Sequence, residues 1–209
     1  HCGLVGSEMC IRDSVHADLT ISRLGVDSYR VVTGGADGNR DWVTLRNYRD
    51  DNGLNADINI RTHDIATLGL WGPKAVNALG NFIDPNEIDI QNFPFVTAKN
   101  LTLNLSGGKK VEVWAARISY VGESGWEIYF NNNKDDGLAL YDSLLEVGVV
   151  PVGIETYANS RRLEKSFRLQ GADLETEYTA IEAAIQRPLV KEADFHGKAA
   201  HLSLSLIHI

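Results

Sequence analysis

The side chain best placed to do chemistry is a carboxylate inside an apolar and aromatic stretch, residues 118–130. This stretch is rich in aromatic and β-branched residues and has glycines at its centre, which is typical of two short strands joined by a tight turn. Alternation along the outgoing strand directs Glu127 and Tyr129 to one face. The opposite face takes the apolar side chains of Trp126, Ile128 and Phe130. Glu127 is therefore either a ligand-binding carboxylate, following a glycine where a ligand can approach closely, or an outward-facing glutamate on a half-buried strand.

Hairpins with helices inserted between them, rather than strict alternation of strand and helix, surround this stretch. The expected strands span residues 18–24, 28–33, 56–61, 66–71, 98–105 and 110–120. The expected helices span residues 39–47, 73–83, 155–167 and 177–185, and a further helix begins at Asp135 or Asp136 and ends at Gly148. This order predicts an α+β fold in which antiparallel sheets are packed with helices.

The composition is that of an ordinary globular protein: of 209 residues, 44% are hydrophobic and 23% are charged. The net charge of −8, with no compensating basic stripe, argues against a general nucleic-acid footprint. No apolar run reaches the roughly 20 residues that a membrane span needs. We therefore expect a soluble protein with neither nucleic acid nor membrane as a partner.

Both ends look foreign to the rest of the sequence and resemble translated adapter read-through. We expect residues 1–14 and 203–209 to be non-native termini and residues 15–202 to form one incomplete domain of a longer protein. The first of these termini holds both cysteines, Cys2 and Cys10, so the remainder has no disulfide framework and no thiol nucleophile. A reducing, cytoplasmic setting fits that absence.

Spacing argues against two other kinds of site. The glycine-rich turn after residue 33 lies between an expected strand and an expected helix, as a dinucleotide-binding loop would. With Gly34 as the first glycine, however, the second and third positions of that pattern fall on Ala36 and Asn39. His63 has no second histidine at metal-ligand spacing, so no metal site is expected.

Residues 120–128, Tyr-Val-Gly-Glu-Ser-Gly-Trp-Glu-Ile, resemble the Tyr-Thr-Gly-Glu-x-Gly-(aromatic)-Glu-(Ile/Val) signature of a folate-binding family. The family comprises the glycine-cleavage T-protein, which is an aminomethyltransferase, and the C-terminal parts of dimethylglycine and sarcosine dehydrogenases. The resemblance covers nearly all of residues 15–200. It implies sheet subdomains with packed helices, tetrahydrofolate as the cofactor, and one-carbon transfer as the reaction.

The resemblance also implies roles for individual residues. Glu127 takes the position that binds the adjacent N–H donors on the amino edge of the pterin, for which a carboxylate is the natural bidentate acceptor. Asp18 takes the position beside the reactive folate nitrogens, as a general base or an electrostatic aid to transfer, and is otherwise a turn residue. Tyr120 and Trp126 would wall in the pterin unless they are core aromatics, and Gly122 would let it approach.

The segment that begins at residue 157 favours the dehydrogenase branch of the family. Ala158 stands where the T-protein has an arginine for the folate tail, and residues 162–173 resemble the Arg-Leu-Glu-Lys run of the dehydrogenases. The chain would then capture a methylene unit from a methylated amine, a small-molecule substrate oxidised by a flavin domain of the full-length protein. Any FAD would belong to that missing domain. The alternatives are a glycine-cleavage-type aminomethyltransferase, a non-catalytic folate-binding module, and a fragment that is inactive alone.

Overall fold

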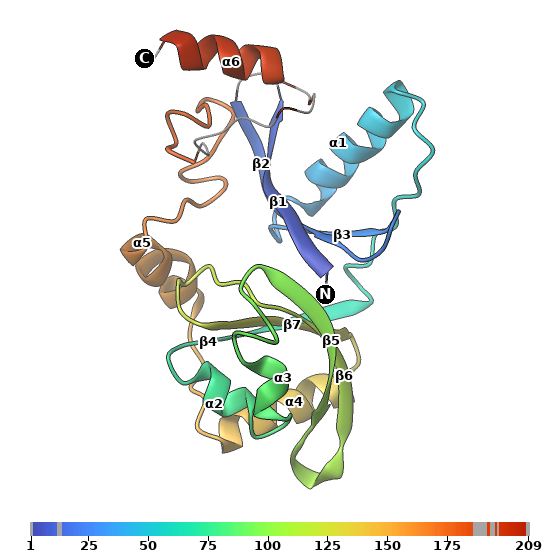
Figure 1. Ribbon diagram of the computed structural model, residues 1–209, viewed down its shortest axis with the longest axis vertical. Helices are drawn as coiled ribbons and strands as arrows, with labels where there is room; N and C mark the ends of the chain where they lie inside the picture. Colours follow the sequence, from blue (N-terminus) through green and yellow to red (C-terminus); the bar gives the residue numbers. More distant parts are fainter. Residues whose placement is uncertain (1, 12–13, 186–191, 193–194, 196, 208–209) are drawn as a thin grey trace. The chain divides into compact units, whose positions relative to one another are not determined.

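A computed structural model describes residues 2–11, 14–185, 192, 195 and 197–207 (Figure 1). The chain divides into two compact units. The first unit comprises residues 1–4 and 59–167, and the second unit comprises residues 5–58 and 168–209. Each unit combines antiparallel strands with helices, which confirms the predicted α+β class. None of the described helices is both long enough and apolar enough to cross a membrane.

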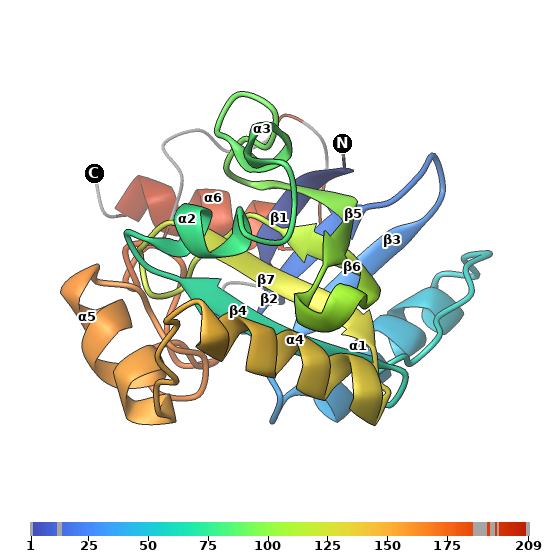
Figure 2. The ribbon, with the colours of Figure 1, turned by 90° about the horizontal axis from the view of Figure 1, so that it is seen from below.

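The first unit is built on an antiparallel sheet in which β5, β6, β7 and β4 lie side by side (Figure 2). Its strands are β4 (Ile65–Trp71), β5 (Thr97–Asn104), β6 (Lys110–Ala116) and β7 (Gly125–Asn131), and the first residues of β1 (Cys2–Ile11) pair with β5. Its helical segments are α2 (Ala75–Leu79), α3 (Pro85–Ile88), η1 (Ser106–Gly108), α4 (Lys134–Glu146), η2 (Thr156–Arg161) and α5 (Arg162–Glu164). Since β7 has a partner strand on each side, the direction of its side chains is fixed.

One face of this sheet carries the hydrophobic core of the first unit. The helices α2 and α4 supply buried Leu79, Leu140 and Leu144 to it. The four strands contribute Leu70, Leu101, Leu103, Val111, Val113, Trp126, Ile128 and Phe130. On β7 the predicted alternation is confirmed, because its apolar side chains enter this core while Glu127 faces the other side of the sheet.

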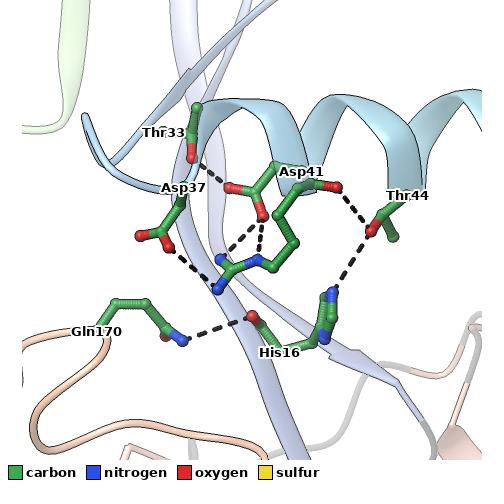
Figure 3. A network of polar contacts seen from close by, with 7 residues as sticks. His16, Thr33, Asp37, Asp41, Thr44 and Gln170 are labelled. Atoms are coloured by element: carbon green, nitrogen blue, oxygen red, sulfur yellow. Dashed lines mark hydrogen bonds and ion pairs between the residues drawn. The ribbon is translucent and has the colours of Figure 1, made fainter.

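The second unit contains the hairpin of β2 (Ser14–Arg23) and β3 (Tyr29–Thr33) together with α1 (Gly38–Asp51) and α6 (Lys198–Ile207). Alternation along β2 buries Val15, Ala17 and Leu19. A polar network fastens the start of α1 to the hairpin (Figure 3). In it, the buried carboxylate of Asp41 accepts a hydrogen bond from the Thr33 hydroxyl and forms an ion pair with Arg40 at 2.9 Å.

Several predicted boundaries are wrong. Residues 56–61 alternate in the sequence but form no strand, because no described strand pairs with them. Residues 177–185 form turns, in which Thr179 and Glu182 exchange hydrogen bonds of 3.0 and 3.1 Å and Ala184 has a φ of 55° that no helix tolerates. The helix expected over residues 73–83 lasts only from Ala75 to Leu79.

The central hairpin differs from the prediction on its incoming side. β6 ends at Ala116, and residues 117–124 form a wide loop instead of a strand and a tight turn. The side chain of Arg117 turns inward and donates to the Phe93 carbonyl at 2.7 Å, and the Ile118 carbonyl accepts the Trp71 indole N–H at 2.9 Å. Because these contacts take the chain away from β7, the two strands do not pair beyond Ala116.

Three further elements refine the sequence-based picture. The helix expected over residues 155–167 is the π-helical turn η2 followed by the short α5. α4 begins after Asn133, whose side chain accepts the Asp136 N–H at 2.7 Å, and not at Asp135 or Asp136. All of β1 and the second half of α6 lie in the segments that are expected to be foreign termini, and the native or foreign origin of those segments stays a prediction.

Candidate functional site

Glu127 is a half-buried carboxylate on β7, between β4 and β6 in the sheet of the first unit. The residues paired with it on the adjoining strands are Gly69 of β4 and Ala116 of β6, neither of which has a side chain larger than a methyl group. Tyr129 donates its hydroxyl hydrogen bond to Glu127 and is itself packed edge-on against Trp114, with ring centroids 5.1 Å apart. Burial raises the pKa of Glu127, and the Tyr129 hydrogen bond offsets part of that rise. The Tyr129 hydroxyl is thus one donor to a carboxylate whose burial disfavours its ionised form.

Trp71 lies on the same face as Glu127 and covers the empty position at Gly69. A Cβ atom added to Gly69 would be 2.1 Å from the Trp71 ring, so only glycine leaves the space that the ring occupies. The indole N–H of Trp71 donates to the Ile118 carbonyl at 2.9 Å, and its ring stacks on Tyr157 with centroids 5.3 Å apart and planes inclined by 25°. Trp71 is therefore held by both its polar and its apolar parts.

Four aromatic rings from separate segments form what we call the aromatic cluster: Trp71, Tyr120, Tyr157 and Phe167. Within it, Tyr120 contacts Tyr157 at 5.4 Å and is stacked on Phe167 at 6.1 Å between centroids. Burial raises the pKa of Tyr157 to about 12, and the negative charge of Glu127 and then Tyr120 add to the rise. The Tyr157 hydroxyl accordingly stays protonated at neutral pH, and it is close enough to Glu127 to interact with it electrostatically.

Gly122, in the loop of residues 117–124, and Gly125, the first residue of β7, serve different purposes. Gly122 has a φ of 72°, and the side chain of Lys165 fills the space beside its Cα, with Cγ only 2.2 Å from where a Cβ would be. Gly125 has a φ of 153°, and a Cβ there would be 1.9 Å from the Leu70 carbonyl oxygen. The pterin was expected to approach Gly122, but the Lys165 side chain occupies that space. Gly125 lets β7 start directly against β4.

Trp126 is not part of this face of the sheet. Its side chain is fully buried in the hydrophobic core, 6.1 Å from the Phe93 ring and 5.0 Å from the Arg117 guanidinium. The prediction that Trp126 walls in the pterin is therefore wrong. Adjacent residues of a strand point to opposite faces, and Glu127 directly follows Trp126. Tyr120, by contrast, belongs to the aromatic cluster and contacts Tyr157, whose hydroxyl interacts electrostatically with Glu127.

Asp18 lies in the second unit, on β2. The strand alternates, so Asp18 is half-buried on the face opposite Ala17 and Leu19, which are buried. Burial raises the pKa of the Asp18 carboxyl. Asp18 thus lies within a strand and is not the turn residue of the alternative interpretation. A carboxylate whose pKa is raised is a better proton acceptor than an exposed aspartate, which suits the general-base role that the resemblance implies.

The model of the family described as the GCVT N-terminal domain matches residues 9–192. The chain belongs to the GCVT N-terminal domain family. It is 32% identical over 192 residues to "Dimethylglycine dehydrogenase, mitochondrial" of Homo sapiens, a match that covers 89% of this chain and 21% of that protein. The protein of the same name from Rattus norvegicus is 32% identical over 195 residues, which cover 90% of this chain and 22% of the relative. The chain thus spans about a fifth of the length of the curated relatives it matches.

Membership of the GCVT family confirms the resemblance noted in the sequence and leaves the roles of single residues as predictions.

Sequence reasoning missed Gly69, Trp71 and Tyr157 as neighbours of Glu127. A signal for the first two existed, because Gly69 and Trp71 lie on one face of a predicted strand, but the pairing of that strand with β7 could not be known.

Among the described residues, no group of three or more histidine, cysteine, aspartate or glutamate side chains could hold a metal ion.

Proposed function

We propose that this chain is the tetrahydrofolate-dependent one-carbon transfer domain of a protein similar to dimethylglycine or sarcosine dehydrogenase. In that role the bound folate would accept a methylene unit released from a methylated amine. The amine would be oxidised by a flavin domain of the longer protein, where any FAD would be bound. The relatives in the GCVT family support this assignment because they are named as dimethylglycine dehydrogenases.

The observation that carries the proposal is the Glu127 carboxylate. It is held rigidly on a strand with partners on both sides, and its pKa is raised by burial, so its charge is incompletely compensated by the Tyr129 hydrogen bond. A ligand edge with two adjacent N–H donors would supply the missing compensation through charge-assisted hydrogen bonds. The amino edge of a pterin is such a group. The aromatic cluster offers flat apolar surfaces near the carboxylate, which suit a fused-ring ligand.

Asp18 is the proposed assisting carboxylate in the transfer step. Its raised pKa and the position that the family resemblance gives it, beside the reactive folate nitrogens, support this role. The dehydrogenase branch is preferred over a glycine-cleavage-type aminomethyltransferase because Ala158 replaces the arginine of the latter. The cysteine-free sequence predicts a cytoplasmic protein, whereas the names of the two relatives place those proteins in mitochondria.

Two substitutions separate binding from transfer. In the purified chain, Glu127→Gln should weaken tetrahydrofolate binding by about 10- to 100-fold, because one charge-assisted hydrogen bond contributes roughly 1.5–3 kcal/mol. The matched control is Glu112→Gln, which alters an exposed strand carboxylate of the same sheet whose partner is Thr102 at 2.7 Å. In the complete enzyme, Asp18→Asn should keep folate binding and lose methylene transfer.

The outcomes distinguish the candidate functions. Equal loss of affinity in the Glu127 and Glu112 variants would show that Glu127 does not bind the pterin. Unchanged transfer in the Asp18→Asn enzyme, with binding intact, would favour a folate-binding module in which Asp18 has no catalytic part. Production of methylene-folate from a methylated amine by the unchanged enzyme, measured by mass spectrometry, is the result that the proposal requires.

A further inference from the structure

One side of the segment formed by η2 and α5 lies against the loop of residues 117–124. Tyr157, Arg161 and Lys165 follow one another at intervals of four residues, so their side chains project from the same side of a helical segment. All three contact the loop region: Tyr157 meets the Tyr120 ring, and the stem of Lys165 lies over Gly122. The contact of Arg161 is an ion pair, and it lies between the other two along the segment.

Arg161 joins the loop through a short and partly shielded ion pair. Its guanidinium nitrogen Nη2 lies 2.6 Å from Glu123 Oε1, and the two side chains are 35% and 28% exposed. Its other terminal nitrogen lies 2.8 Å from Glu164 Oε2, one turn further along the same segment. Because Glu164 already binds one nitrogen of the Arg161 guanidinium, the other nitrogen is oriented towards Glu123. Arg161 therefore loses less side-chain freedom when it pairs with Glu123.

We propose that Arg161 is a positioning residue for the Glu127 site, through an ion pair with Glu123 that fixes the aromatic wall formed by Tyr120 and Tyr157. The inference rests on the proposed function, since the ligand whose affinity it controls is the folate. The wall depends on two segments that are 37 residues apart at Tyr120 and Tyr157, and neither segment is a regular strand or a long helix. Without the ion pair, only the ring contacts and the Lys165 stem over Gly122 would hold them together.

A surface ion pair with no positional effect is the competing interpretation. Isolated exposed pairs contribute about 0–1 kcal/mol and are often without measurable effect. The pair between Arg161 and Glu123 differs because both partners are more than half shielded and because ring stacking flanks it on the side of Tyr157. Coupled contacts of this kind reinforce one another, so breaking the pair should loosen both segments.

The test uses charge reversal and charge exchange in the full 209-residue chain. The variants are Arg161→Glu, Glu123→Arg and the double variant that carries both changes. Arg61→Glu is the control, because Arg61 forms an exposed ion pair of the same length, 2.6 Å, with Asp64 in the same unit but outside the η2 and loop segments. Two quantities are measured: the dissociation constant for tetrahydrofolate, and the hydrogen–deuterium exchange rates of residues 118–124 and 156–167.

Each single variant should bind tetrahydrofolate about three- to tenfold more weakly and should exchange faster in both segments. The double variant should return both quantities to within about twofold of the unchanged chain, because the exchanged charges can pair again. Arg61→Glu should alter neither quantity. Rescue by charge exchange separates positioning from a general loss of stability, which the double substitution would not repair.

Two results would overturn the inference. If Arg161→Glu leaves both the affinity and the exchange rates unchanged in a chain that binds tetrahydrofolate, the ion pair has no positional effect. If the single variants lose affinity and the double variant does not recover, the two residues act independently. Failure of the proposed function has a different signature, namely no binding by the unchanged chain, and the exchange rates of the variants then decide the positioning role alone.

Discussion

Gly69→Ala is the substitution that should disturb the Glu127 site most selectively. Gly69 lies opposite Glu127 in the register of β4 and β7, and the Trp71 ring occupies the space where a Cβ would be, at 2.1 Å. A methyl group there must push the ring aside. Displacement breaks the stacking of Trp71 on Tyr157 and the indole hydrogen bond to the Ile118 carbonyl, which is 2.9 Å long.

The expected cost follows from those two contacts. An aromatic pair contributes about 0.5–1.5 kcal/mol beyond its buried area, and a hydrogen bond contributes about 1 kcal/mol. Gly69→Ala should therefore lower the free energy of unfolding of the first unit by about 1.5–2.5 kcal/mol. It should also weaken tetrahydrofolate binding, since the displaced ring belongs to the aromatic cluster. Urea unfolding followed by circular dichroism measures the first effect, and calorimetric titration measures the second.

The control for Gly69 is Gly153→Ala in the same unit. A Cβ at Gly153 would meet nothing within 4 Å, so this substitution should be neutral or stabilise the fold by up to about 1 kcal/mol through the unfolded state. If Gly69→Ala proved as stable as Gly153→Ala and bound folate equally well, the Trp71 ring would not be held over Gly69. The account of the aromatic wall beside Glu127 would then be wrong.

Three further outcomes are expected. Gly125→Ala should destabilise the first unit by more than about 3 kcal/mol, because strain at its positive φ adds to a clash with backbone, and the midpoint of urea unfolding measures this loss. Glu127→Gln should make the chain more stable than the wild type at pH 7: the raised pKa of Glu127 means that ionisation costs the folded state free energy. That advantage should shrink as the pH falls towards 4.5, where the unfolded carboxyl also protonates, and thermal melting across this range measures it. Asp41→Ala should cost about 1–3 kcal/mol in unfolding experiments on the second unit, since it removes the acceptor of the half-buried Thr33 hydroxyl and one of the two carboxylates that pair with Arg40.

Each of these predictions has a contradicting result. A Gly125→Ala chain with an unchanged unfolding midpoint would show that β7 can begin away from β4. A Glu127→Gln chain that is less stable than the wild type at pH 7 would show that the ionised carboxylate is well compensated without ligand. An Asp41→Ala chain of unchanged stability would show that the polar network of Figure 3 does not stabilise the second unit.

The strands were easier to predict from the sequence than the helices and loops. The alternation on β7 correctly separated Glu127 from Trp126, since a period of two needs only local information. That same alternation contradicts the expectation that Trp126 walls in a pterin bound at Glu127. The segment 56–61 shows the limit of the method, because alternation produces a strand only where another strand is present to pair with it.

The surroundings of Glu127 depend on contacts that are distant in sequence. The pairing of Gly69 with Glu127 joins residues 58 positions apart, and the stacking of Trp71 on Tyr157 joins residues 86 positions apart. No propensity or local spacing encodes such a contact. The wide loop after Ala116 was missed for the same reason, since it depends on where the side chains of Arg117 and Trp71 find their carbonyl partners.

The central claim is that Glu127 accepts hydrogen bonds from the amino edge of a pterin. The most direct measurement is a cycle of four calorimetric titrations, in which the wild type and Glu127→Gln are each titrated with a folate and with its analogue lacking the 2-amino group. The account predicts that removing the amino group weakens binding to the wild type by about 10-fold or more and changes binding to the Gln variant much less. Equal losses in both proteins would show that the amino group and Glu127 do not interact, and would contradict the account.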